Sequence, residues 1–325
     1  LLMSLQNPRR YVPWLGAAWA MQLLSGHTQT VFMTGVALGV VGLVQQAANN
    51  HQWRPLLRPL ALISVAAVIG VILAAPQLIP AQELTALSNR DGGLTTQEAT
   101  AFSLEPALIG RGLLPSYGGQ PFSEYVSYLG VIGLGLAVLG ALGGGRKRWP
   151  WIALGAMGLI FALGRFTPVY LLLAEFPGFD LFRVPARWLV LWSLGGSILA
   201  GLGIQTYMRP SYSLGMVGMR LTPMDIGRRR QTLPRYLPIA LGVIGLLAAS
   251  TLLADRAADQ VNGTALPSLV TWAGWGAATA GLVALLIVGK HRRPRLLALL
   301  IVAEVFLASM TLPYNDATDP DVWHE

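Results

Sequence analysis

The sequence predicts an all-α polytopic membrane protein with about nine transmembrane helices. Three observations predict this fold: 54% of the 325 residues are hydrophobic, only 12% are charged, and the mean hydropathy is +0.54. An ordinary soluble domain has about 25% charged residues, because charge must cover its surface. A helical bundle in hydrocarbon instead leaves Leu, Val and Ala facing outward.

Nine apolar stretches approach the length of about 20 residues that crosses a bilayer core at a rise of about 1.5 Å per residue. The first and fifth are the short ones. Neither a repeat nor a linker divides the chain, so we expect one membrane domain over residues 1–325. The stretches are residues 11–26, 28–46, 58–79, 127–144, 149–164, 187–207, 236–254, 268–289 and 295–313.

The basic residues predict the orientation, because Lys and Arg are retained on the cytoplasmic side of a membrane. With the N-terminus inside and the C-terminus outside, most of the 23 Lys and Arg residues fall inside, in clusters at 9–10, 146–148, 228–230 and 292–293. Nearly all acidic residues then fall outside. Topology therefore accounts for the net charge of +8, and nucleic-acid binding loses its main support.

Three segments between the apolar stretches are long enough to have a role. Residues 80–126 form a large outer loop with Gly and Pro turn signals. Residues 165–186, also outside, contain the apolar piece 169–174, which is too short to span and predicts an interfacial or re-entrant helix. Residues 208–235 are basic and cytoplasmic, and we expect them to contact membrane lipids with anionic heads.

Polar residues at the predicted outer helix ends are the first candidates for a site, since a polar group near hydrocarbon is costly unless it is paired or hydrated. Gly26-His27-Thr28-Gln29-Thr30 joins the first two helices. His27 and Gln29 bind a polar substrate in one interpretation. In the other they cap helix ends at the outer interface, and the sequence leaves both open.

A second candidate is an acid just beyond the third predicted helix. Glu83 fits a general base or a ligand to a divalent cation, with Arg90 as its partner or as an anion contact. A structural ion pair explains both residues equally well. No metal-binding motif accompanies them, and the absence of cysteine excludes disulfides and thiolate sites. A divalent cation is thus a candidate cofactor, and Glu83 is the one residue named as its ligand.

A third candidate is an arginine pair at the outer mouth of the sixth predicted helix. Arg183 and Arg187 are four residues apart, and two guanidinium groups can clamp a phosphate or pyrophosphate. Pro185 between them prevents a regular helix through the segment, so a shared face is assumed. The alternative is that they extend to lipid heads or pair with Glu175 and Asp180.

Glu304 is the acidic residue within a predicted helix, the last one. An acid inside a membrane span is either functional or a hydrogen-bond partner of a neighbouring helix, and both interpretations stay open here.

An ordered set of motifs contains most of these candidates. This set resembles the YfhO-like bacterial membrane proteins, which are similar to the type C glycosyltransferase superfamily. The resemblance covers residues 26 to 203, and its last motif is the most specific. The motifs are Gly26-His27-x-Gln29, Gln77-Leu78-x-Pro80, Glu83-Leu84, Ser88-x-Arg90, Leu163-Gly164-Arg165-x-Thr167-Pro168, and Pro177-Gly178-Phe179 with Phe182-Arg183-Val184-Pro185-Ala186-Arg187.

The resemblance implies a glycosyltransferase-like, multi-pass protein of the bacterial plasma (inner) membrane that uses a polyprenyl-phosphate-linked sugar at the outer face. Its substrate-binding residues would be His27, Gln29, Gln77, Arg90, Arg183 and Arg187. In that superfamily the catalytic acid lies in the first outer loop, and the opening Leu1-Leu2-Met3 reads as a segment beyond that region. We therefore expect an N-terminal portion to be missing, and no residue here inherits the catalytic role.

Two other functions compete with the enzyme. One is a non-catalytic subunit that packs on membrane-protein partners through small residues such as Gly133-x-Gly135, Gly195-Gly196 and Gly201-x-Gly203. The absent acidic loop favours it. The other is a transporter, which the scarcity of charge at mid-membrane disfavours.

Overall fold

The computed structural model describes residues 2–49, 57–87, 94–117, 123–176, 178–179, 181–208, 232–254, 266–287 and 294–310. Within these ranges there are helices and turns but no strand, which confirms the all-α class. Each predicted apolar stretch holds one long helix. These helices are α2 (Pro8–Leu24), α3 (Thr28–Asn49), α4 (Leu57–Ala86), α7 (Val131–Gly143), α8 (Trp149–Ala162), α10 (Leu189–Met208), α12 (Thr232–Ser250), α13 (Leu269–Ile287) and α14 (Pro294–Ser309).

Short elements fill the segments between the long helices. Four are α-helical: α1 (Leu2–Gln6), α5 (Thr96–Ala99), α6 (Ile109–Leu113) and α9 (Pro168–Leu173). Others are 3₁₀ turns, among them η2 (Pro106–Leu108), η3 (Ser123–Tyr125), η4 (Gly145–Arg148), η5 (Gly164–Phe166) and η6 (Pro185–Trp188).

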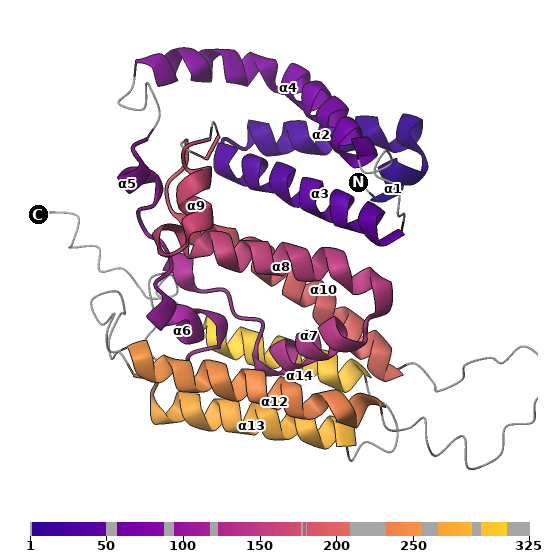
Figure 1. Ribbon diagram of the computed structural model, residues 1–325, viewed down its shortest axis with the longest axis vertical. Coiled ribbons are helices and arrows are strands. Elements are labelled where there is room, and N and C mark those ends of the chain that lie inside the picture. The colour runs from indigo at the N-terminus through magenta and orange to yellow at the C-terminus, as the bar shows by residue number, and fades with distance from the viewer. Residues whose placement is uncertain are drawn as a thin grey trace, which may run out of the picture. The chain divides into compact units, whose positions relative to one another are not determined.

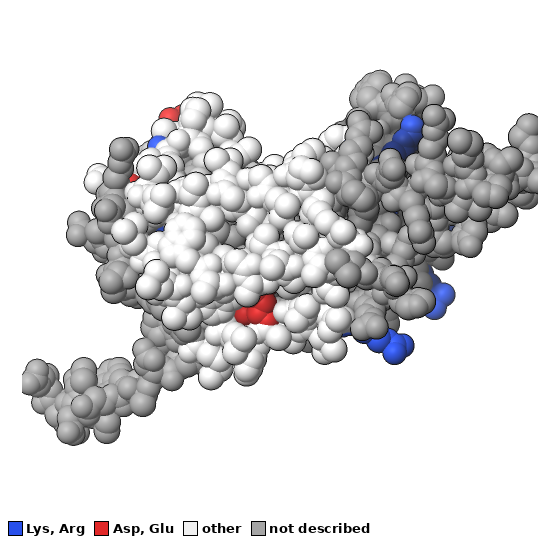
Figure 2. Space-filling view, turned by 90° about the horizontal axis from the view of Figure 1, so that it is seen from below, with Lys and Arg blue, Asp and Glu red and all other residues white. Residues whose placement is uncertain are grey.

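Five helices in the described part of the chain are long and apolar enough to cross a membrane. Figure 2 shows a face on which most described residues are uncharged, with an acidic patch near its middle and basic side chains toward the right. The coarse prediction of an apolar, multi-helix membrane protein is therefore supported. Nine crossings and their orientation stay predictions. The five spans are Thr28–Asn49, Leu57–Thr85, Pro185–Tyr207, Tyr236–Ala254 and Leu269–Ile287.

Contacts among the described residues divide the chain into two compact units. Unit 1 comprises Leu1–Ser103 and Arg146–Gly195, and unit 2 comprises Leu104–Gly145 and Gly196–Glu325. The division concerns contacts alone, so one membrane domain over residues 1–325 stays a prediction.

In unit 1, α2 packs along α4, and α3 lies between this pair and α8 (Figure 1). Two glycines allow the close approach of α2 and α4. A Cβ atom on Gly16 would lie 2.7 Å from Cγ2 of Ile69, and one on Gly70 would lie 3.1 Å from Cβ of Trp19. Around this contact a small apolar core forms from Val12, Trp19, Val31, Ile63 and Ala66.

The third predicted helix is longer than expected. Its predicted end at residue 79 is wrong, because α4 continues through Pro76 and Pro80 to Ala86. A proline inside a helix removes one donor and frees a carbonyl, but membrane helices tolerate this where the freed groups find other partners. Glu83 consequently lies on the helix and not in the following loop.

The two other predicted loops have different outcomes. The predicted short helix at 169–174 is confirmed as α9, Pro168–Leu173, while its place at a membrane interface stays a prediction. Most of the basic segment 208–235 lies outside the described residues, which resume at the start of α12.

In unit 2, α7 contacts α12, α13 and α14, and α12 and α13 lie side by side (Figure 1). α7 also meets the second half of α10 backbone to backbone. A Cβ atom on Gly140 would collide with the carbonyl oxygen of Leu199, and one on Gly203 with that of Leu136. Small residues permit this distance between membrane helices, where close packing replaces the hydrophobic effect.

Glu304 joins α14 to the first turn of α7. Its buried carboxylate, 7% exposed, accepts hydrogen bonds from the backbone N–H groups of Val131 (2.6 Å) and Ile132 (3.2 Å). These are donors that a helix N-terminus leaves without an intrahelical partner. Of the two interpretations of Glu304, the structure supports the hydrogen bond to a neighbouring helix. Gly130, with φ +74°, leaves room for the carboxylate.

The contact between α7 and α10 predicts the effect of a methyl group at Gly140. We expect Gly140→Ala to lower the free energy of unfolding by about 1–3 kcal/mol, since a backbone carbonyl cannot rotate away from the new Cβ. Thermal unfolding of the purified chain in detergent, followed by tryptophan fluorescence, measures this change.

Gly242→Ala on α12 is the matched control, because a Cβ atom there meets nothing within 4 Å. Helix propensity makes this substitution neutral or slightly stabilising. Equal melting temperatures for the two variants would contradict the backbone contact.

Candidate functional site: a polar pocket at the α2–α3 turn

A polar pocket of about 250 Å³ lies in unit 1 beside the turn between α2 and α3. It brings together four of the residues predicted from the sequence: His27, Gln29, Arg183 and Arg187. More than 150 residues separate the first two from the last two in the chain. The complete lining is Gly26, His27, Thr28, Gln29, Leu94, Leu181, Phe182, Arg183 and Arg187.

The α2–α3 turn is built by a glycine and a cap. Gly26 has φ +80°, a left-handed conformation that costs glycine no side-chain clash. His27 precedes the first residue of α3, and its Nδ1 accepts the backbone N–H of Thr30 (3.3 Å). His27 is thus the N-terminal cap of α3, as one interpretation of the sequence predicted, and it also lines the pocket.

Gln29 is the central residue of the pocket. It is only 6% exposed, and its carboxamide uses both ends. Oε1 accepts a hydrogen bond from Nη1 of Arg187 (2.7 Å), and Nε2 donates to the backbone carbonyl of Arg183 (2.9 Å). The first bond is charge-assisted and therefore stronger than a neutral one. Gln29 consequently positions both arginines and is not simply a residue that faces a ligand.

The backbone is left-handed at one residue between the two arginines. Val184 has φ +63° and ψ +70°, which a β-branched residue rarely adopts, and Pro185 then opens the 3₁₀ turn η6. The predicted interruption of the helix at Pro185 is therefore confirmed. Strain of this kind occurs where the surrounding contacts fix the backbone, often at functional sites.

An aromatic cluster fixes the segment that carries the arginines. The ring of Trp188 stacks on Phe179 at 5.9 Å and meets Phe161 edge-on at 5.0 Å. Phe32 on α3 contacts Phe179, Phe182 and Trp188. Aromatic pairs of this geometry contribute about 0.5–1.5 kcal/mol each beyond their buried area. Phe182 belongs to this cluster and also lines the pocket, so the cluster helps to position that part of the lining.

Among the described residues, Arg183 has an acidic partner that the sequence analysis did not name, while the alternative partner Asp180 lies outside the described residues. Its Nη2 lies 3.6 Å from Oε1 of Glu98, and both side chains are about half exposed (48% and 47%). Glu98 also caps α5 together with Thr95. Hydrogen bonds from the backbone and side chain of Thr95, and then the charge of Arg183, lower the pKa of Glu98. An exposed ion pair contributes little to stability, so Arg183 remains accessible to a competing anion.

Ser103 joins the segment that carries Glu98 to the turn after α8. Ser103 Oγ accepts the backbone N–H of Arg165 (3.0 Å) and donates to the carbonyl of Thr100 (2.6 Å). A Cβ atom on Gly164, which has φ +45°, would collide with this oxygen. The Leu163-Gly164-Arg165 motif thus has a structural role: its glycine allows residues 94–103 to lie against the end of α8.

Two predicted site residues are not brought to the pocket, and a third is not described. Gln77 and Glu83 are exposed on α4 and do not line it, and Arg90 lies outside the described residues. No group of three or more His, Asp or Glu side chains in the described part of the chain is placed to hold a metal ion. The pairing of Glu83 with Arg90 and a divalent cation at Glu83 stay untested predictions.

Sequence reasoning missed Glu98. Its signal was present, since Thr95-Thr96-Gln97-Glu98 has the spacing of a capping box, which predicts a helix start inside the outer loop. The contact of this helix with Arg183 could not be read from the sequence, because it joins residues 85 positions apart in the chain.

The charge of the pocket favours an anionic ligand. Of its described lining residues two are arginines and none is acidic. Guanidinium groups present planar forks of donors that match phosphate and carboxylate oxygens. Comparisons with protein-family models, with curated proteins and with solved structures give no match, so the functional argument rests on this geometry and on the residue motifs.

The Gln29 bridge predicts a clear loss of stability. We expect Gln29→Leu to lower the free energy of unfolding by about 1–3 kcal/mol, because it leaves the Arg187 guanidinium and the Arg183 carbonyl without this partner. The melting temperature in detergent measures the loss.

Gln22→Leu, at the other side of the same turn, is the control. The Gln22 amide makes only a long 3.4 Å contact with Thr34 Oγ1, so its loss has a smaller effect. Equal effects of the two substitutions would show that Gln29 is not a bridge.

Proposed function

We propose that the chain is a glycosyltransferase-like membrane protein that binds the phosphate of a polyprenyl-phosphate-linked sugar in the polar pocket. The observation that supports this most is the Gln29 bridge, which directs Arg187 and the Arg183 backbone to one pocket that has no acid among its described lining residues. The bacterial plasma (inner) membrane and the sugar donor come from the YfhO-like resemblance.

The chemistry of sugar transfer explains why two arginines are useful. An acceptor hydroxyl oxygen attacks the anomeric carbon, the bond from that carbon to the phosphate oxygen breaks, and the lipid phosphate leaves with the electron pair. Donors that are already positioned stabilise the negative charge on the leaving phosphate without reorganisation. The acceptor's proton must pass to a general base.

The proposal assigns no base to a described residue. Glu83 is exposed on α4 and does not line the pocket. Glu98 contacts Arg183, but its lowered pKa makes it a poor proton acceptor near neutral pH. The proposed base therefore lies elsewhere than in these two carboxylates.

The membrane topology is part of the proposal. Nine crossings, with the N-terminus inside and the C-terminus outside, place the α2–α3 turn and the pocket on the outer side, where a lipid-linked donor presents its phosphate. The exposed basic residues Arg146 and Lys147 at η4 support an inner side for the α7–α8 turn.

The topology predicts which turns react from outside intact bacterial cells. Because the natural chain has no cysteine, single cysteines report unambiguously. We expect a membrane-impermeant maleimide to label Ser25→Cys in intact cells and Lys147→Cys only after permeabilisation. The reverse pattern would overturn the orientation, and labelling of both from outside would overturn the number of crossings between them.

The pocket predicts which arginines hold the phosphate. We expect Arg187→Ala to weaken binding of a polyprenyl phosphate to the purified chain by about tenfold or more, since charge-assisted hydrogen bonds contribute about 1.5–3 kcal/mol. Arg183→Ala has a smaller effect because Arg183 is half exposed and already paired. Displacement of a fluorescent polyprenyl phosphate in detergent measures both.

Arg165→Ala is the matched control for this experiment. Arg165 is an exposed arginine of unit 1 that stacks on Phe166 and does not line the pocket. Its loss leaves binding unchanged. Wild-type affinity in both pocket variants, with their folds intact, would remove the phosphate site and the proposed function with it.

A non-catalytic subunit is the second candidate, and the lack of an acid among the described lining residues favours it. The six glycines suggested for partner contacts do not favour a subunit. A Cβ atom added to Gly195, Gly196 or Gly203 would meet other atoms of this chain, and of the six only at Gly201 would it meet nothing within 4 Å. Stoichiometric copurification with a larger membrane complex, without sugar transfer, would favour the subunit.

A further inference from the structure

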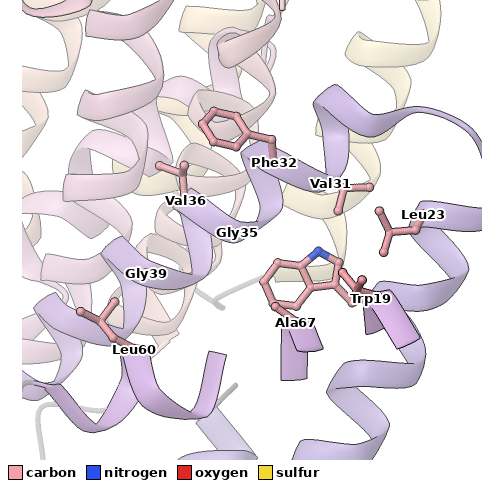
Figure 3. Close-up of a pocket in the computed structure, with 10 residues that line it drawn as sticks. Trp19, Leu23, Val31, Phe32, Gly35, Val36, Gly39, Leu60 and Ala67 are labelled. Atoms are coloured by element: carbon pink, nitrogen blue, oxygen red, sulfur yellow. The ribbon is translucent and has the colours of Figure 1, made fainter. Parts of the chain in front are cut away.

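An apolar groove of about 470 Å³ lies between α2, α3 and α4 in unit 1 (Figure 3). Trp19 and Leu23 of α2, Val31 and Gly35 of α3, and Leu60 and Ala67 of α4 contribute to its lining. Figure 3 shows the Trp19 ring beside α3 at Gly35, with Leu23 and Val31 next to each other beyond it. No charged residue is among the described lining residues, and nearly all of their side chains are hydrocarbon.

Two glycines on one face of α3 line the groove. Gly35 and Gly39 are four residues apart, which places them one above the other on a helix. A Cβ atom on Gly39 would meet only Cδ2 of Leu60, at 3.8 Å, an ordinary contact. A Cβ atom on Gly35 would lie 3.2 Å from the Trp19 ring, so glycine there makes room for that ring, whereas the absence of a side chain at Gly39 leaves the groove open beside Leu60.

The groove is open to the surface of the molecule along α4. Leu60 and Val71 at this edge are 38% and 50% exposed, although both line the groove. α4 is also one of the helices able to span a membrane. A hydrocarbon chain can thus enter sideways from the bilayer without crossing a polar surface.

The groove and the polar pocket are neighbours, because one ring from each lining is in contact with the other. Phe32 lines the groove, Phe182 lines the pocket, and their ring centroids are 5.5 Å apart. Leu23 and Val31 likewise line the groove and flank the turn whose residues 26–29 line the pocket. A molecule with an anionic head and an apolar chain therefore matches the two cavities together.

We propose that the groove holds the hydrocarbon chain of the same lipid whose phosphate lies between Arg183 and Arg187. The inference rests on the proposed function for the phosphate and adds a site for the chain. A chain that leaves the bilayer for the groove exchanges one apolar environment for another and gains little. The head therefore supplies the affinity, and the groove selects the shape of the chain.

The test uses hexadecyl phosphate with a diazirine at mid-chain, incorporated with the full chain into phosphatidylcholine vesicles. We expect the photolabel to concentrate on peptides from α3 and α4 that contain residues 31–39 and 60–71. A matched hexadecyl trimethylammonium probe, which has the same chain and the opposite charge, distributes over lipid-exposed helices. Equal labelling of the groove and of the exposed face of α12 by the phosphate probe would refute the proposal that the groove binds the hydrocarbon chain.

Two variants separate the head from the chain. Gly39→Leu fills the groove, so groove labelling falls by about tenfold, while binding of the short butyl phosphate to the pocket is unchanged. Gly242→Leu, at an open glycine of α12, is the control. Leu60→Trp narrows the groove from its exposed edge and provides a second variant should Gly39→Leu fail to fold.

Arg187→Ala lowers both groove labelling and butyl phosphate binding. Unchanged butyl phosphate binding in that variant would refute the phosphate site and hence the proposed function. Suppose that butyl phosphate binds normally to the unsubstituted chain, while Gly39→Leu and Leu60→Trp leave groove labelling unchanged. This result would refute the groove as the site of the hydrocarbon chain and leave the phosphate site intact. Groove labelling that persists in Arg187→Ala would refute a single shared ligand.

Discussion

The polar pocket depends on one buried carboxamide. A side chain that is removed from water must satisfy both its donor and its acceptor, and Gln29 does this with two groups of one distant segment. It therefore fixes the side chain of Arg187 and the backbone of Arg183 at once. The left-handed Val184 between them persists because this bridge and the stacking of Trp188 hold both sides of it.

Glycine sets how closely the helices approach. In lipid, helices gain little from hiding apolar surface from one another, so backbone contact and polar bonds decide their packing. Gly16 and Gly70 bring α2 to α4 in unit 1, and Gly140 and Gly203 bring α7 to α10 in unit 2. The Glu304 carboxylate acts on the same principle, because it satisfies the first N–H groups of α7 where water is scarce.

Glycine has two effects along α3. Gly35 makes room for the Trp19 ring, and Gly39 leaves open space beside Leu60 in an apolar groove near the polar pocket. A ligand with an anionic head and an apolar chain fits this combination better than a soluble anion does. The described lining residues of both cavities belong to unit 1.

The sequence by itself determined the all-α class, the positions of the long helices and four of the pocket residues, because hydropathy and helix-ending residues are local signals. The prediction was wrong at the end of α4, which was expected at residue 79, because the helix continues through Pro80 to Ala86. The sequence analysis also treated His27 and Gln29 as one candidate site and Arg183 and Arg187 as another. Only the tertiary structure decided that these four residues meet and that Arg183 pairs with Glu98. It also decided that Gln77 and Glu83 do not line the pocket. Hydrogen bonds between residues more than 150 positions apart depend on how helices pack, and no local pattern encodes that.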